Sequence, residues 1–155
     1  TLTITPSHEH FLLTHIRQKV LIHTERLQSA NPKPDAKTFV LFLPINEIHD
    51  VGLLFINYEL ISRGYHTIYL GENVPLEDLN LLNNLYENIT YVSYFTIKPD
   101  PEDLDDYLTK FHIEIIKGTT NSVRLIGRRF TDYNSKKTPK QMKLYQSIEK
   151  LVKDL

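Results

Sequence analysis

An acidic residue and a histidine stand two positions apart, directly after an apolar run in this 155-residue chain. Glu47 and His49 follow the run 40–43, which ends at Pro44. Such a run is typical of a parallel strand covered on both faces, and open α/β sheets bind ligands at the carboxyl ends of these strands. The carboxylate can accept the proton of one ring nitrogen, which leaves the other as a metal ligand or a base. The pair therefore predicts a binding site at this edge of a sheet.

Gly52 adds room at the same place, because a residue without a side chain lets a bulky ligand approach the start of the next helix. No glycine-rich phosphate loop follows the run, which disfavours a dinucleotide or P-loop site. His8, His10 and His15 lack the spacing of four that would pair two of them as zinc ligands on one helix. The competing interpretation of the Glu47 segment is an exposed loop without a ligand. Three residues alone leave the two interpretations evenly matched.

The elements that must position these residues alternate along the chain. We expect helices over 50–63, from Pro75, from 99–103 and over 141–155, and strands over 40–43, 65–70, 89–95 and 122–126. Alternation of this kind predicts right-handed crossovers and one parallel sheet. The expected fold is a flavodoxin-like (Rossmann-like) α/β domain of four to five strands with flanking helices. Its strand order is predicted as 2-1-3-4, with any fifth strand at the edge.

A separate helix is expected before this domain. Residues 6–28 carry an apolar stripe, with Thr5 as N-cap and Pro6 in the first turn. A lone amphipathic helix has to bury its stripe against something else. We therefore predict that 1–30 is the C-terminal part of a helical bundle, 31–37 a linker and 38–155 the α/β domain.

Composition narrows the class of protein. The chain has no cysteine, which excludes disulfides and zinc–thiolate sites. A hydrophobic content of 41% and a charged content of 24% are those of a globular domain. No apolar run is long enough to span a membrane, so no membrane partner is expected. No signal peptide is recognisable, so a cytoplasmic location is expected. The net charge of -1 argues against nucleic-acid binding by this chain itself.

The sequence Glu47-x-His49-x-x-Gly52 resembles the D-x-H-x-x-G motif of cobalamin-binding domains. It has the E-x-H form seen in MerR-family transcriptional regulators of the light- and cobalamin-responsive CarH and CarA type. The segments 47–55, 63–65 and 69–75 are similar to those regulators as well.

Three further segments are similar to the same family. Ser93-Tyr94-Phe95 partly matches its S-x-L motif, and Gly127-Arg128 keeps the first glycine of its Gly-Gly pair. Glu9-His10 is similar to half of the W-x9-E-H signature in the helical bundle before the domain.

The resemblance implies a role for these residues. His49 would be the lower axial ligand of cobalt, oriented by Glu47. Three small residues would line the slot for the nucleotide tail, and the Glu-His pair of the leading helix would face the upper side of the corrin. The implied cobalamin-binding set is Glu47, His49, Asp50, Val51, Gly52, Ser93, Phe95, Gly127, Arg128, Glu9 and His10, in which the slot residues are Gly52, Ser93 and Gly127.

The implied function is a non-enzymatic sensor of adenosylcobalamin or methylcobalamin. Cobalamin binding would be coupled to the formation of a homo-oligomer, either a dimer or a tetramer. It would also be coupled to the binding of operator DNA by an N-terminal helix-turn-helix domain outside this chain. One alternative is a cofactor-free dimerisation module of the same family, favoured by Phe95 and Arg128, which would plug the slot. Arg128 could instead swing out or pair with the phosphate of the tail. The other alternative is a corrinoid carrier for methyl transfer, which the MerR-like flanks disfavour.

Overall fold

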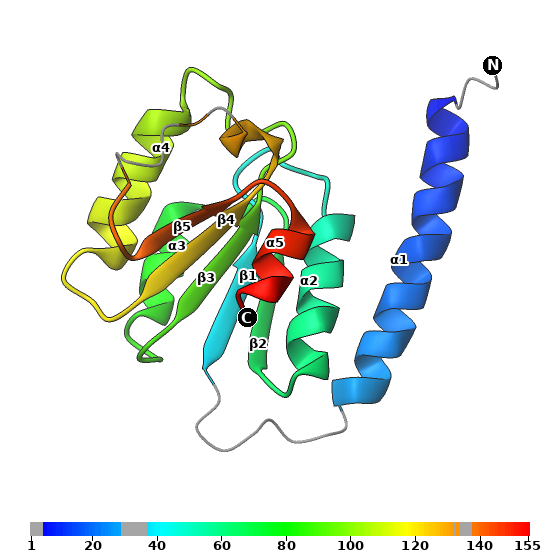
Figure 1. Cartoon of the computed structure of the whole chain (residues 1–155), viewed down its shortest axis with the longest axis horizontal. Helices are drawn as coiled ribbons and strands as arrows, with labels where there is room; N and C mark the ends of the chain where they lie inside the picture. The colour runs from blue at the N-terminus through cyan, green and yellow to red at the C-terminus, as the bar shows by residue number, and fades with distance from the viewer. Residues whose placement is uncertain (1–4, 29–36, 132, 134–137) are drawn as a thin grey trace.

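The computed structural model describes residues 5–28, 37–131, 133 and 138–155, and its centre is a parallel sheet with helices on both faces (Figure 1). The sheet order is β2-β1-β3-β4-β5, and every pairing is parallel. This confirms the predicted α/β fold and strand order, with the fifth strand at the edge. The strands are β1 (Thr38–Phe42), β2 (His66–Gly71), β3 (Thr90–Tyr94), β4 (Ser122–Ile126) and β5 (Met142–Tyr145).

Alternate side chains of the strands belong to two separate cores, because successive residues of a strand point to opposite faces. One core joins residues such as Val40 and Tyr91 to α3 (Leu76–Leu82) and α4 (Leu104–Phe111). A π-helical turn, η1 (His112–Ile116), follows α4, and a 3-10 turn, η2 (Arg128–Phe130), follows β4.

The second core joins residues such as Leu41 and Val92 to α2 (Val51–Ser62) and α5 (Ile148–Lys153). Burial on both faces accounts for the continuous apolar sequence of β1. The helix α2 ends near Gly64, whose φ of 80° suits a residue without a side chain.

Helix α1 (Pro6–Gln28) has the predicted bounds and packs on the outer side of α2 (Figure 1). The Thr5 hydroxyl accepts a hydrogen bond from the backbone N–H of His8 at 3.4 Å, as expected for an N-cap. Thr24 is the buried residue of α1, and Phe11 and Ile16 stay exposed. The helical bundle remains a prediction, and residues 31–36 of the predicted linker lie outside the described residues. No helix in the described part of the chain combines the length and apolar character needed to cross a membrane.

The predicted helix over 141–155 is wrong, because this segment forms β5 and then α5. Met142 and Leu144 belong to the core beneath α4, whereas Tyr145 belongs to the core beneath α2 and α5. Ser147 then has an extended backbone, and its hydroxyl caps α5 by accepting a 3.4 Å hydrogen bond from the N–H of Lys150. Apolar residues spaced by two and by four fit both a strand and a helix, so spacing alone did not distinguish them.

Candidate ligand site at the carboxyl edge of the sheet

Glu47 is fully buried, and its carboxylate accepts six hydrogen bonds. Oε1 accepts from the backbone N–H of Ile48 and His49, each at 3.0 Å, and from Nδ1 of His49 at 2.6 Å. Oε2 accepts from the backbone N–H groups of residues 96–98, at 2.7–3.0 Å. One carboxylate therefore joins the loop after β1 to the loop after β3.

These hydrogen bonds decide the ionisation of Glu47. Burial by itself would raise the pKa of the carboxyl group, but the backbone N–H groups of Lys98 and Ile97 and the ring and backbone of His49 lower the pKa to about 2. An ionised carboxylate is an acceptor only, so Nδ1 of His49 carries the hydrogen. The His49 side chain is 46% exposed, and Nε2 is left to coordinate a ligand.

A hollow of about 500 Å³ lies between this loop and α1. Its lining brings α1 together with the carboxyl ends of β1 and β3, and consists of His10, Leu13, Thr14, Arg17, residues 48–52, Tyr94 and Thr96. Large apolar side chains are exposed on the two loops that Glu47 joins. Ile45 is 49% exposed, Ile48 57% and Ile97 45%. Exposed apolar groups on the loops that surround this site suit a ligand with a broad apolar surface.

An ion pair fastens α1 across this hollow. Nη2 of Arg17 lies 2.5 Å from Oδ1 of Asp50, whose side chain is only 7% exposed. Burial raises the pKa of Asp50, and the positive charge of Arg17 offsets part of this rise. Asp50 is therefore poorly solvated and depends on a residue of α1 for its compensation.

The structure brings most of the first motif together at this hollow. His49, Asp50, Val51 and Gly52 line it, and Glu47 lies buried behind them. On α1, His10 lines the hollow, whereas Glu9 is not among the lining residues.

The other predicted residues lie elsewhere. Phe95 is fully buried in the core beneath α3 and α4. By the alternation of β3, Ser93 faces the same side, and its buried Oγ has no hydrogen-bond partner among the described residues. Arg128 is exposed and lines another open hollow of about 550 Å³ together with Arg129, and the two hollows share Thr96. The binding roles of Ser93, Phe95 and Arg128 therefore stay predictions.

The two glycines of the motifs face neighbouring parts of the protein itself. A Cβ added to Gly52 would lie 3.3 Å from the Tyr94 ring. A Cβ added to Gly127, at φ +153°, would lie 2.1 Å from the carbonyl oxygen of Phe95.

Sequence reasoning missed Tyr94, which is the middle residue of the second motif. It also missed Arg17, although its spacing from Leu13 places both on one face of α1.

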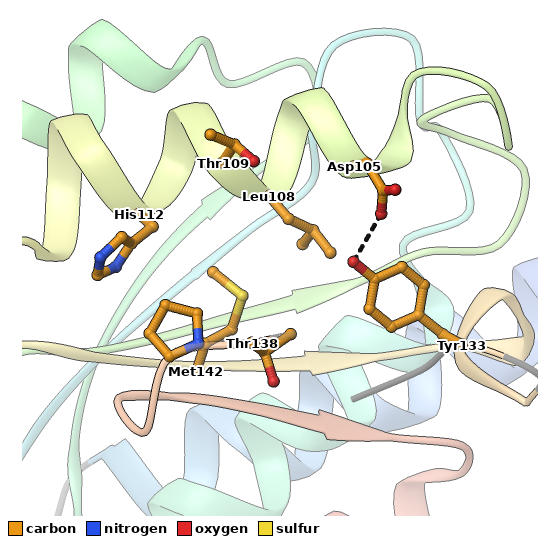
Figure 2. A pocket seen from close by; sticks show the side chains of 8 residues that line it. Asp105, Leu108, Thr109, His112, Tyr133, Thr138 and Met142 are labelled. Atoms are coloured by element: carbon orange, nitrogen blue, oxygen red, sulfur yellow. Dashed lines mark hydrogen bonds between the residues drawn. The ribbon is translucent and has the colours of Figure 1, made fainter. Parts of the chain in front are cut away.

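A third, smaller hollow of about 270 Å³ lies between α4 and the sheet edge (Figure 2). The Tyr133 hydroxyl donates a 2.7 Å hydrogen bond to Asp105 at its rim, and His112 and Met142 contribute further lining. None of the residues predicted for the ligand site lines this hollow. Within the described residues, no three His, Cys, Asp or Glu side chains gather where they could hold a metal ion.

Comparison with known proteins gives a match in fold only. No protein-family model and no curated protein matches the sequence. Among solved structures 22 chains match, and one is described as the structure of the Methanosarcina barkeri monomethylamine corrinoid protein. It superposes with a TM-score of 0.66 at 15% identity, over 87% of this chain and 62% of that chain. The present chain thus spans less than two thirds of that protein, and the likeness at this identity is one of fold.

Proposed function

We propose that this chain is a corrinoid-binding module in which Nε2 of His49 is an axial ligand of cobalt. The observation that carries the proposal is the His49 imidazole, held through Nδ1 at 2.6 Å by a buried carboxylate and 46% exposed at the hollow. The E-x-H-x-x-G motif supports this assignment. The fold likeness to a protein described as a corrinoid protein supports it further.

A single imidazole suits a metal whose equatorial positions are already filled by a macrocycle. The carboxylate partner fixes the tautomer and orientation of His49 and increases the basicity of the ring, which strengthens the bond to the metal. Ile48 lines the same hollow as His49 and offers apolar contact there, and His10 lines it from α1. The corrinoid would supply the cobalt centre, while these residues hold and orient it.

We further propose a sensing role without catalysis. A ligand in the hollow would contact both α1 and the sheet edge, so its binding would favour one arrangement of α1 over another. That change would alter self-association of the chain and, in a regulator, operator binding by a helix-turn-helix domain outside this chain. The resemblance to the MerR-family regulators supports this role.

A corrinoid carrier is the second candidate, supported by the printed description of the structural neighbour. A carrier has to present cobalt to another protein, so α1 would have to move away from the hollow. Light scattering with and without ligand distinguishes the candidates. A sensor should change its oligomeric state on binding a corrinoid, whereas a carrier should bind it without such a change.

The ligand assignment is tested by titrating the protein with adenosylcobalamin, methylcobalamin and aquocobinamide while recording the visible spectrum. We expect at least one of them to show a saturable shift with the wild type, and His49→Ala to lose it. His23→Ala is the matched control, because His23 is an exposed histidine of α1 outside the hollow lining. A folded wild type that alters no spectrum would contradict the proposal, and so would an unchanged shift in His49→Ala. A wild type that self-associates without any corrinoid would favour the cofactor-free module.

A further inference from the structure

We infer that this site accepts a corrinoid that lacks a nucleotide tail and discriminates against complete cobalamin. The inference rests on the proposed function and narrows its ligand class. In complete cobalamin the lower side of cobalt carries a base joined to the ring through a sugar and a phosphate. For His49 to bind on that side, the base has to leave cobalt and the tail has to find another place.

The protein directly beneath His49 is closed. Glu47 occupies the side of the His49 imidazole that faces the sheet. It is 0% exposed and hydrogen-bonded on both oxygens. Beside it, the Tyr94 ring lies 3.3 Å from the position of a Cβ on Gly52, which is closer than most contacts of a real Cβ atom. Tyr94 therefore fills the space that a glycine at this position would otherwise leave for a ligand.

The route further along the sheet is closed as well. The N–H of Phe95 donates to the carbonyl of Ile126 at 2.7 Å, and the N–H of Gly127 donates to the carbonyl of Tyr145 at 3.0 Å. Strand pairing thus continues past the ends of β3 and β4, and Gly127 makes room for the Phe95 carbonyl rather than for a ligand. Leu41 and Leu43, on the side of α2, are both 0% exposed. A buried tail would have to displace tightly packed core residues.

The open part of the site lies above the loops, where a flat macrocycle needs room. The hollow of about 500 Å³ is lined there by His10 and Ile48, and the adjacent Ile97 is exposed. A tailless corrinoid uses only this open region and the Nε2 atom. Complete cobalamin either keeps its own base on cobalt, which excludes His49, or has a detached tail that finds no buried pocket. Such a tail would have to lie on the surface, where the hollow of Arg128 and Arg129 shares only Thr96 with this one.

The experiment compares aquocobinamide with hydroxocobalamin by visible titration of the wild-type protein. We expect aquocobinamide to bind with a Kd at least about tenfold lower, a difference that corresponds to ~1.4 kcal/mol. Tyr94→Ala, which opens the space beside Gly52, should narrow the difference by tightening hydroxocobalamin. Tyr86→Ala should leave the ratio unchanged, because Tyr86 is 38% exposed and outside the hollow lining. Tyr94→Leu replaces Tyr94→Ala if the alanine variant does not fold.

Equal or tighter binding of hydroxocobalamin by the wild type overturns this inference and leaves the proposed function intact. An unchanged ratio in a folded Tyr94 variant also overturns it. Absence of binding of either compound by folded wild-type protein overturns the proposed function, and the present inference with it.

Discussion

Glu47 has a local role that does not depend on any ligand. Its two oxygens each receive three hydrogen bonds, and all six donors belong to residues 48–49 and 96–98. Hydrogen bonds to a buried charged acceptor are stronger than those between neutral groups. At the residue scale, this carboxylate holds the loop that carries His49.

An amide cannot replace this carboxylate. In Glu47→Gln, the NH₂ group would face two backbone N–H donors on one side or three on the other, which leaves buried donors unpaired whichever way the amide is turned. We expect the free energy of unfolding to fall by about 2–3 kcal/mol in urea denaturation. Glu102→Gln is the matched control, because Glu102 is exposed and should change the value by less than about 0.5 kcal/mol. Equal stability of the two variants would contradict the assigned role.

The contribution of ionised Glu47 to stability should also appear in the pH dependence of folding. The pKa of Glu47 is about 2 in the folded chain against an ordinary value of 4.5. A carboxyl group with a lowered pKa in the native state stabilises that state above its unfolded pKa, and this contribution is lost as the pH falls through the folded pKa. We expect the stability difference between wild type and Glu47→Gln to shrink from pH 4.5 towards pH 2. A constant difference in the free energy of unfolding between the two proteins over that pH range would contradict the lowered pKa of Glu47.

Gly127 is required by backbone geometry. With φ at +153° and a Cβ position only 2.1 Å from the Phe95 carbonyl oxygen, Gly127→Ala should destabilise the protein by about 3 kcal/mol or more. Gly118→Ala is the control, because Gly118 also has a positive φ, of +79°, but open space around its Cβ position. It should lose only about 1–2 kcal/mol in the same thermal or urea experiment. A smaller loss for Gly127→Ala than for Gly118→Ala would contradict this packing.

At the scale of elements, one ion pair governs how α1 is held. Arg17→Met keeps much of the apolar stem but leaves Asp50, only 7% exposed, without its cation. We expect amide hydrogen exchange in α1 to accelerate about fivefold, which corresponds to roughly 1 kcal/mol of local stability. Arg26→Met, an exposed change in the last turn of the same helix, is the control. Similar exchange rates in the two variants would mean that apolar contacts alone hold α1.

At the scale of the whole molecule, alternating sequence patterns were sufficient to predict the parallel sheet and its order. They were sufficient because β1 and β3 are buried on both faces and the intervening helices have clear ends at residues such as Gly64. The edge strand β5 was missed because only four residues form it and their apolar spacing also fits a helix.

The candidate site was predictable in part. The Glu47–His49 contact is local in sequence, so spacing alone could suggest it. The other half of the Glu47 environment comes from backbone N–H groups of residues 96–98, which carry no side-chain signal. The Tyr94 ring beside Gly52 is likewise a contact between residues 42 positions apart, fixed by the sheet order rather than by a motif.

The sixfold acceptor role of Glu47 has an evolutionary consequence. Selection for a well-formed sheet edge retains this acid even in descendants that no longer bind a corrinoid, whereas the imidazole supplies only one of its six hydrogen bonds. Among homologous sequences, the acid should therefore outlast the histidine. Survival of the histidine is then the better marker of a working ligand site.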